Sequence, residues 1–294
     1  MKIVIGIPAF NEEKNIAKII LKLKKFSDEI IVCDDGSSDL TGEIARELGA
    51  HVIRHEKNSG YGSAIKTIFL KAKEMECDIL VTFDADGQHD VNEIPQIIEP
   101  IEKNQTDIVI GSRFLTKKNN IPKYREFGIK TITSITNSSI GKNLSDSQSG
   151  FRAYNKKALD CIFPSDSGMG ISTEILIKAV KNSLKISEIP IIVSYEGETS
   201  KHHPVSHGVS VILSTIKFTS IEHPLKFYGI PGITSFSIGM FFIFWTIQMF
   251  SDVGRIITNI SLIGIGLLVI GLVLMVTAAI LFSIVNVVRE NHRN

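Results

Sequence analysis

Two apolar segments near the C-terminus constrain the fold of this chain more than any other feature. They cover roughly residues 227–250 and 260–288 of the 294. Each exceeds the ~20 residues that an α-helix needs to cross the hydrocarbon core of a bilayer. Two adjacent runs that are almost free of charge are untypical of buried helices in a soluble protein. We therefore expect a membrane anchor of two transmembrane helices over residues 224–294.

The charges around these segments predict an orientation. The short loop 251–259 carries one acidic and one basic residue. Basic residues stand outside the pair at Lys217, Lys226, Arg289 and Arg293. Because lysine and arginine are enriched on cytoplasmic flanks, we expect both outer ends on that side. Residues 1–10 lack the basic start, long apolar core and cleavage site of a signal peptide, so the preceding domain is expected in the cytoplasm.

Upstream of about residue 224, strand-like and helix-like patterns alternate. Apolar runs of strand length lie at 2–7, 29–33, 51–54, 79–83 and 107–111. One buried helix face is indicated by the spacing of Ile16, Ile19, Ile20 and Leu23, and further helices are expected at 62–75 and 173–183. This alternation predicts an α/β domain over 1–223 with a mostly parallel, Rossmann-like sheet between helices.

Residues 205–222, just before the first apolar segment, mix apolar residues with serine, threonine and lysine. The pattern fits an interfacial amphipathic helix and a helix packed on the α/β domain about equally well.

The composition excludes several classes of protein. The 32 basic and 31 acidic residues leave a net charge of +1, which gives no reason to expect nucleic acid as a partner. The three cysteines have neither paired nor metal-ligand spacing, so a disulfide scaffold and a zinc site are both disfavoured.

Polar clusters follow the predicted strands, and in a parallel sheet ligands gather at the carboxyl ends of strands. The cluster Asp84-Ala85-Asp86-Gly87-Gln88-His89 comes directly after the run 79–83. In an extended stretch, residues two apart face the same way, so Asp84, Asp86 and Gln88 can present oxygen atoms in one direction. Mg²⁺ and Mn²⁺ prefer such ligands. We predict a metal site here; His89 is either a further participant or an ordinary polar loop residue.

The cluster Asp34-Asp35-Gly36-Ser37-Ser38-Asp39 follows the run 29–33. Carboxylates at a strand end can accept hydrogen bonds from ribose hydroxyls or base N–H groups. The alternative is a turn in which Ser38 or Asp39 caps the following helix. The cluster that begins at Pro8 also ends a strand, and there Asn11 is either a site residue or a helix cap.

Taken in order, the motifs IPAFNEE, DDGSSD, NSGYG, DADGQH and GSRF resemble glycosyltransferase family 2, whose catalytic domain has the GT-A fold. The later DSQSGFRAY at 146–154 is similar to a loop of dolichyl-phosphate mannose synthases and related polyprenyl-phosphate hexosyltransferases. The resemblance covers roughly residues 3–202, and the two terminal apolar segments also fit this subgroup.

The resemblance implies roles for particular residues. A nucleotide pocket would be lined by Pro8, Ala9, Glu12, Asp35, Asp39 and Asp84. Asp84, Asp86 and Gln88 would hold Mg²⁺ or Mn²⁺. The acceptor phosphate would meet Arg113, Arg152 and Ser149, and Lys201 in Ser200-Lys201-His202 would close over the donor diphosphate. The catalytic set would be Asp86, Arg113, Arg152 and Lys201.

The implied reaction is inverting transfer of a hexose or N-acetylhexosamine from a UDP- or GDP-linked donor to dolichyl or polyprenyl phosphate. Its product would be a lipid-linked sugar for protein N-glycosylation or cell-surface glycans. At Gly87 and at residues 196–198 the sequence differs from the residues that mannose synthases usually carry. These differences weaken the alternative that the donor is GDP-mannose. Processive synthases carry a Q-x-x-R-W element that is absent here. A non-catalytic nucleotide-sugar-binding scaffold is a further alternative, which the intact D-x-D disfavours.

Two points stay open at this stage. Glu174 either orients the sugar or an acceptor group, or is an acidic residue favoured at a helix start, and the second is narrowly preferred. Association into a homo-oligomer is compatible with the sequence but not indicated by it.

Overall fold

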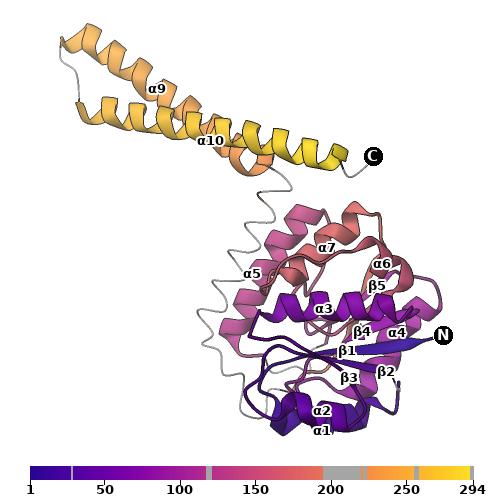
Figure 1. The fold of residues 1–294 in the computed structure, drawn as a ribbon. Helices are drawn as coiled ribbons and strands as arrows, with labels where there is room; N and C mark the ends of the chain where they lie inside the picture. The colour runs from indigo at the N-terminus through magenta and orange to yellow at the C-terminus, as the bar shows by residue number, and fades with distance from the viewer. Residues whose placement is uncertain (28, 117–120, 195–219, 221–223, 255–257, 292–294) are drawn as a thin grey trace. The chain divides into compact units, whose positions relative to one another are not determined.

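A computed structural model describes residues 1–27, 29–116, 121–194, 220, 224–254 and 258–291 (Figure 1). The chain divides into two compact units, Met1–Thr215 and Ile216–Asn294. The predicted helix at 205–222 lies outside the described residues except for Ser220.

One sheet of seven strands forms the centre of the first unit, in the order β3-β2-β1-β4-β6-β5-β7. The strands are β1 (Ile3–Ala9), β2 (Glu29–Asp34), β3 (His51–Arg54), β4 (Ile79–Thr82), β5 (Ile108–Ser112), β6 (Arg152–Asn155) and β7 (Ile186–Pro190). β1 to β4 run parallel, and β7 runs parallel to β5. Only β6, among these strands, is antiparallel to its neighbours, β4 and β5. The sheet is thus mostly parallel, as the alternating pattern predicts.

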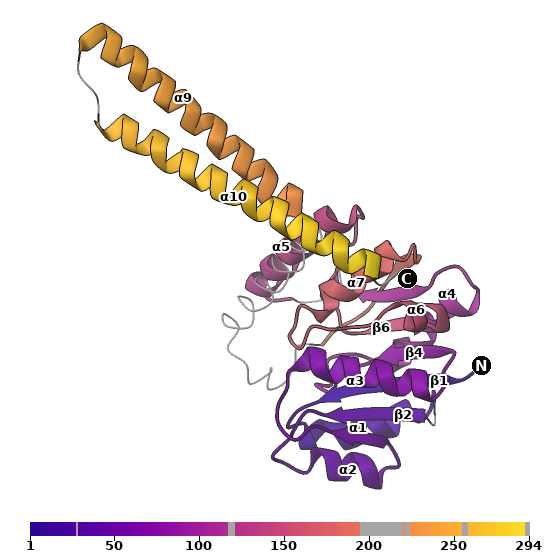
Figure 2. The same cartoon turned by 45° about the horizontal axis from the view of Figure 1, so that its top comes forward.

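Helices cover both faces of the sheet (Figures 1 and 2). They are α1 (Glu13–Leu23), α2 (Thr41–Glu47), α3 (Tyr61–Glu74), the 3₁₀ turn η1 (Val91–Glu93), α4 (Ile94–Glu102), α5 (Lys123–Ile140), α6 (Lys156–Cys161) and α7 (Ile171–Lys181). α3 packs on β1 and β2, where Gly6 leaves room for Ile68. The predicted face of α1 is buried at Ile16, Ile19, Ile20 and Leu23. These side chains join those of α4 and the sheet in one apolar core.

The second unit is a hairpin of two long helices. A π-helical turn, η2 (Leu225–Gly229), leads into α9 (Ile230–Val253), and α10 (Thr258–Asn291) returns beside it. The backbones lie close at Gly239 and Gly271, where an added Cβ would stand 2.7 Å from the Leu268 nitrogen and 2.6 Å from the Phe236 nitrogen. Ser235 Oγ also donates to the Leu267 carbonyl at 2.9 Å. Glycine contacts of this kind are typical of helix pairs in bilayers.

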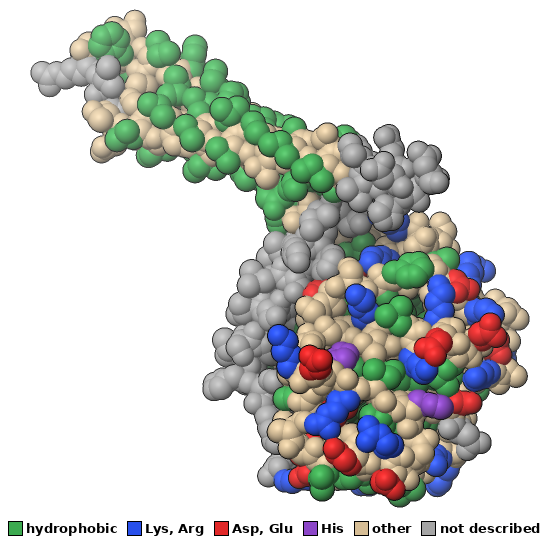
Figure 3. Space-filling view, viewed as in Figure 1, with side chains coloured by type: hydrophobic (Ala, Val, Ile, Leu, Met, Phe, Trp, Pro, Cys, Tyr) green, Lys and Arg blue, Asp and Glu red, His purple; other side chains and the backbone are tan. Residues whose placement is uncertain are grey.

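Both helices are long and apolar enough to cross a membrane, over Leu225–Asp252 and Thr258–Val285. Their large side chains are mostly exposed, which a core helix of a soluble protein would not show. Hydrophobic atoms accordingly cover much of the visible surface of the hairpin (Figure 3).

Candidate active site

The polar clusters that follow the strands meet at one edge of the sheet. β1, β2 and β4 are parallel, so the segments after Ala9, Asp34 and Thr82 leave from the same edge. Arg152 pairs with Thr82 in the antiparallel β6, which brings the segment 146–151 to this edge as well. Thr82 Oγ1 fastens that segment by donating to the Gly150 carbonyl at 2.7 Å. Ligands of α/β sheets bind at such an edge.

The loops after β1 and β2 are joined to each other. Asn11, in a left-handed conformation with φ 55°, donates its N–H to Ser37 Oγ and accepts the Ser38 N–H at 2.8 Å. It therefore links two loops and does not cap α1. The Asp35 N–H donates to the Ala9 carbonyl at 2.9 Å, and Pro8 and Ala9 form the end of β1 beside it.

Glu12 and Asp39 stand where these loops turn into helices. The Glu12 N–H donates to Thr41 Oγ1 at 2.8 Å, and its carboxylate accepts from Asn15 at 2.9 Å. Asp39 accepts the Thr41 and Glu13 N–H groups at 3.1 and 3.2 Å. Partial burial raises the pKa of Asp39, but these hydrogen bonds outweigh it and hold the pKa below its usual range. Asp39 thus stabilises the turn before α2.

Asp34 and Asp35 are both buried but have different surroundings. Asp34 accepts the Ser37 N–H at 2.9 Å, and its second oxygen lies 3.4 Å from Arg54 Nε. Asp35 accepts from His55 Nδ1 at 2.6 Å and from two backbone N–H groups of the loop before α3. Asp34 closes its own turn, whereas Asp35 connects β2, β3 and α3.

The D-x-D segment lies after β4. Tyr61 donates to Asp84 Oδ1 at 3.3 Å, and His89 Nε2 lies 3.6 Å from Asp84 Oδ2. Asp86 Oδ1 accepts the Gln88 N–H at 3.0 Å. Desolvation by surrounding atoms and then repulsion from Asp84 raise the pKa of Asp86. Because the Asp86 side chain is solvent-accessible, its desolvation is incomplete, and repulsion from Asp84 is the main cause of the raised pKa.

This donor set fits a hard divalent cation. The charge of Asp84 disfavours ionisation of the neighbouring Asp86, and a bound cation would relieve that repulsion. Across the described residues, no group of three or more His, Cys, Asp or Glu side chains is arranged to hold a metal. Asp84, Asp86 and the amide of Gln88 are the expected ligands from this loop, and the remaining ligands of a Mg²⁺ ion would come from phosphate and water.

His89 is packed between aromatic rings. Its side chain is 7% exposed, with the rings of Phe83 and Phe151 at 5.8 and 5.3 Å between centroids. Nδ1 is buried and has no hydrogen-bond partner. The backbone of His89 pairs with Val193, and the Ser194 N–H donates to the Gln88 carbonyl at 2.9 Å. The chain thus runs beside the D-x-D loop up to residue 194. Lys201 lies outside the described residues.

Arg113 forms a two-pronged ion pair with Asp146. Its Nε and one terminal nitrogen donate to the two carboxylate oxygens at 2.6 and 2.8 Å. Burial raises the pKa of Asp146, but the charge and hydrogen bonds of Arg113 outweigh it and lower the pKa. Glu188 on β7 holds the same loop by accepting the Ser145 and Asp146 N–H groups at 2.7 and 2.9 Å.

Arg152 does not have the surroundings that a phosphate-binding residue needs. Its side chain is only 1% exposed. The guanidinium donates to the carbonyls of Ser147 at 2.7 Å, Ser149 at 2.7 Å and Ser172 at 3.2 Å. A buried guanidinium that is engaged by three carbonyls is not available to a phosphate. We therefore assign Arg152 a structural role: its hydrogen bonds connect the segment 146–151 to α7. Ser149 Oγ is likewise buried, and it has no hydrogen-bond partner.

Glu174 has a specific role in the fold. It is 1% exposed, accepts the N–H groups of Ser165 and Asp166, and pairs with Lys178 Nζ at 2.6 Å. Burial raises the pKa of Glu174, but these hydrogen bonds outweigh it and the pKa is lowered. The turn it holds packs on Gly62 at the start of α3, where an added Cβ would stand 2.3 Å from the Asp166 carbonyl oxygen. Glu174 thus stabilises the turn that precedes α7.

Arg125 is a residue that sequence reasoning missed. It is half-buried in the first turn of α5, and its charge lowers the pKa of Asp86 in opposition to the larger raising effects. A basic residue in a first helical turn opposes the helix dipole. Arg125 and Lys123 both occupy this unfavourable position in α5. Two basic residues at a helix start are the sequence feature that could have drawn attention to Arg125.

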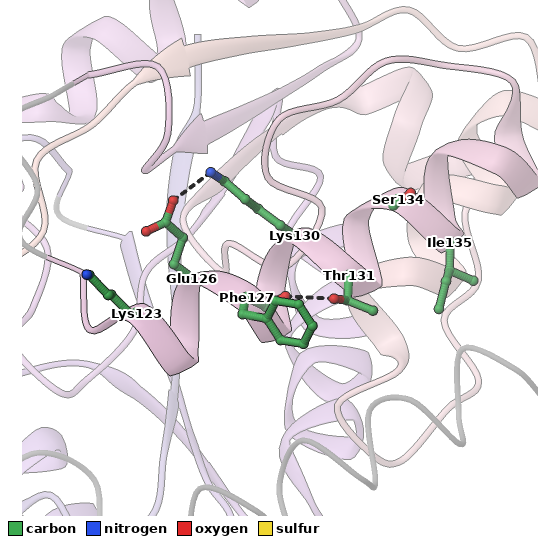
Figure 4. A pocket seen from close by; sticks show the side chains of 7 residues that line it. All are labelled: Lys123, Glu126, Phe127, Lys130, Thr131, Ser134 and Ile135. Atoms are coloured by element: carbon green, nitrogen blue, oxygen red, sulfur yellow. Dashed lines mark hydrogen bonds and ion pairs between the residues drawn. The ribbon is translucent and has the colours of Figure 1, made fainter.

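An apolar hollow of about 530 Å³ lies along α5 (Figure 4). It is lined by Lys123, Glu126, Phe127, Lys130, Thr131, Ser134 and Ile135. Phe127 is 74% exposed, and Lys130 pairs with Glu126 at the rim. The hollow contains none of the carboxylates of the sheet edge, but it lies on the same helix as Arg125.

Comparison with known proteins identifies the family. The sequence profile of glycosyl transferase family 2 matches residues 4–163. A UDP-N-acetylglucosamine–dolichyl-phosphate N-acetylglucosaminyltransferase of Methanococcus voltae is 38% identical over 229 residues, which cover 70% of this chain and 89% of that protein. A dolichol-phosphate mannosyltransferase of Pyrococcus furiosus is 36% identical over 65% of this chain and 56% of its own length.

Solved structures agree on the fold. Glucosyl-3-phosphoglycerate synthase of Mycobacterium tuberculosis, solved with Mn²⁺ and UDP, superposes with a TM-score of 0.58 at 20% identity, covering 74% of this chain and 79% of that one. The order of the strands, the motifs at their carboxyl ends and these matches lead to one conclusion. The chain belongs to glycosyl transferase family 2, and it is a glycosyltransferase with a GT-A catalytic unit.

Proposed function

We propose that this enzyme transfers one sugar from a nucleoside-diphosphate sugar to a polyprenyl phosphate of the dolichyl type. The observation that carries the proposal is that the polar segments after β1, β2 and β4 and the segment 146–151 meet at one edge of the sheet. Such an edge can hold a metal-bound diphosphate next to a second phosphate. Two similar enzymes are named for dolichyl or dolichol phosphate, which supports this acceptor.

The donor would lie over the carboxyl ends of β1, β2 and β4. Pro8, Ala9 and Asp35 stand at the first two strand ends and are proposed to line the nucleoside pocket. Glu12 and Asp39 shape the turns around it. Asp84 lies at the end of β4, where Tyr61 and His89 contact its carboxylate. From there it would contact both the nucleotide and the cation.

We propose Mg²⁺ or Mn²⁺ as the cation, with Asp84, Asp86 and Gln88 as its protein ligands. The neighbouring structures solved with Mn²⁺ or Mg²⁺ and UDP support a divalent cation in general. When bound, it would neutralise charge that develops on the departing diphosphate.

The acceptor phosphate would lie on the side of the edge formed by α5. Arg125 is the proposed principal contact, and Arg113, already paired with Asp146, would add charge behind it. The exposed apolar hollow on α5 would accommodate the first part of the lipid chain. Lys201 is proposed to close over the donor diphosphate, as the resemblance to the family implies.

The chemistry is a single displacement with inversion. A phosphate oxygen of the lipid attacks the anomeric carbon while the bond from that carbon to the diphosphate oxygen breaks. A phosphate monoester has a second pKa of about 6, so it is largely dianionic near neutral pH and needs no strong general base. The enzyme's main work is to align two anions and reduce their repulsion.

The hairpin would anchor the enzyme, with two spans and both chain ends in the cytoplasm. Its length, apolar composition and exposure support membrane insertion. The basic residues that flank the spans support the orientation.

The test uses the full chain in detergent or nanodiscs with a short-chain polyprenyl phosphate. UDP- and GDP-linked sugars are screened one at a time, with Mg²⁺, with Mn²⁺ and with a chelator. We expect a lipid-linked sugar from one donor class, only when metal is present. Release of nucleotide that is independent of the lipid phosphate would contradict the acceptor, and full activity under chelation would contradict the metal.

A further inference from the structure

Asp35, in the proposed nucleoside pocket, is a buried carboxylate that accepts three hydrogen bonds from the protein. Its side chain is 5% exposed. Oδ1 accepts from His55 Nδ1 at 2.6 Å and from the Ser59 N–H at 3.0 Å, and Oδ2 accepts the Gly60 N–H at 2.8 Å. A carboxylate offers about four acceptor positions. Three are filled by the protein, which leaves one position on Oδ2 for a ligand.

The contact with Asp35 determines that His55 carries a proton on Nδ1. A carboxylate can only accept, so Nδ1 must carry the proton that points at Asp35. Nε2 lies 2.9 Å from Thr67 Oγ1 on α3 and 3.5 Å from Cys33 Sγ on β2. A threonine hydroxyl can both donate and accept, so it can partner Nε2 in either state of the ring. The imidazole is thereby held from both sides.

We propose that His55 is a positioning residue for the donor nucleotide: it fixes the plane of the Asp35 carboxylate so that the remaining position on Oδ2 points at a base N–H or a ribose hydroxyl. The backbone contacts of Ser59 and Gly60 alone leave one acceptor position of Oδ1 empty, and the carboxylate could then turn toward water. The inference rests on the proposed function only in that Asp35 faces the nucleotide.

Two substitutions separate positioning from general support of the fold. His55→Ala removes the donor to Asp35. His55→Asn keeps it, because the asparagine amide nitrogen can stand close to the place of Nδ1, although the contact with Thr67 is lost. His51→Ala is the matched control: it removes a nearby histidine, on β3, whose side chain is 51% exposed and pairs with Glu29.

The experiment titrates UDP and GDP, each with Mg²⁺ and with Mn²⁺, into the full-length chain in nanodiscs by calorimetry. For the nucleotide that wild type binds, we expect about a ten- to hundred-fold weaker Kd in His55→Ala, the range for a lost charge-assisted hydrogen bond. His55→Asn should stay within about three-fold of wild type, and Thr67→Val should weaken binding by about two- to five-fold. Thermal melting of each variant reports on folding.

Steady-state kinetics supply the second measurement. We expect the KM for the donor to rise in His55→Ala while kcat at saturating donor is kept. An unchanged Kd and KM in a folded His55→Ala would overturn the inference, as would a fall in kcat alone, an equal loss in His55→Asn, or a wild type that binds neither nucleotide. If His55→Ala does not fold, Thr67→Val decides: an unchanged Kd and an unchanged donor KM in that variant would overturn the inference.

The outcomes also separate this inference from the proposed function. If wild type binds a nucleotide and the variants follow the expected order, but no sugar reaches lipid phosphate, the positioning role stands and the proposed acceptor is wrong. If transfer to lipid phosphate occurs but His55→Ala changes neither Kd nor KM, the proposed function stands and the positioning role is wrong.

Discussion

In the sheet-containing unit, large apolar side chains such as Ile5, Ile7 and Phe83 have no exposed surface, whereas in the hairpin Phe244 is 68% exposed and Ile247 is 62% exposed. The first unit is organised to remove apolar surface from water. The second leaves it outside and joins its helices through close glycine contacts, as helices in hydrocarbon do. The comparison indicates that chemistry and anchoring reside in separate units, and substitutions in one should leave the other's property intact.

The largest expected effect tests whether chemistry lies entirely in the first unit. Asp86→Asn should lower the transfer rate about a thousand-fold or more, because losing a cation that is worth several kcal/mol costs about a factor of ten per 1.4 kcal/mol. The rate is measured with donor, lipid phosphate and metal in nanodiscs. Asp90→Asn, an exposed residue of the same loop, is the control and should keep activity. Comparable rates for the two variants would disprove the assignment of Asp86.

The next effect tests the reassignment of Arg152. Arg152→Ala leaves three buried carbonyls without this donor, and an unpaired buried acceptor costs about 1–3 kcal/mol, so we expect about 3 kcal/mol less stability in the first unit. The stability of Arg152→Lys should lie between those of wild type and Arg152→Ala. Urea unfolding, followed by the fluorescence of a label on the first unit, measures the change. A stable Arg152→Ala whose loss is confined to lipid-phosphate dependence would return Arg152 to the acceptor site.

A smaller effect concerns the acceptor side of the edge. Arg125→Ala should raise the KM for lipid phosphate about ten- to hundred-fold, since a charge-assisted contact is worth about 1.5–3 kcal/mol, while donor affinity changes little. Initial rates at varied lipid phosphate and fixed donor give this value. Arg46→Ala, which removes an exposed arginine from α2, serves as the control. A change in donor affinity alone would place Arg125 with the donor diphosphate.

The smallest effect on catalysis is expected in the hairpin. A Cβ at Gly271 would stand 2.6 Å from the Phe236 nitrogen, so Gly271→Leu must separate the helices, at a cost of about 1–3 kcal/mol to their association. Transfer to a short, water-soluble acceptor should change less than about three-fold, since the chemistry is elsewhere. Distances between spin labels on α9 and α10 report the separation. Gly266→Leu is the matched control, because a Cβ there meets nothing within 4 Å. A parallel loss of transfer would show that the units are coupled.

The first half of the sheet could be predicted because its signals are local. β3 matches the predicted run at 51–54, and β1, β2, β4 and β5 differ by only one or two residues at their ends. β6 and β7 were missed. β6 is four residues long and begins with an arginine, and it is defined by pairing with β4 and β5 and not by an apolar run of its own.

In the candidate site, too, the residues with a local sequence signal could be predicted, and those defined by distant contacts could not. The carboxylates after β1, β2 and β4 were found because they lie in the polar segments that follow those strands, and their binding roles stay predictions. The buried position of Arg152 could not be read from the sequence, since its acceptors are main-chain carbonyls as far away as Ser172. Periodicity and motifs describe side chains, and they do not predict the direction of a main-chain carbonyl in the folded protein.

The two candidate spans are matched in length, at 28 residues each. At 1.5 Å per residue such a helix is about 42 Å long, while the hydrocarbon core is about 30 Å thick. In a bilayer of that thickness, a helix of this length would be accommodated by tilting or by local thickening of the bilayer. Hydrophobic mismatch would then couple the tilt of the anchor to the thickness of the membrane.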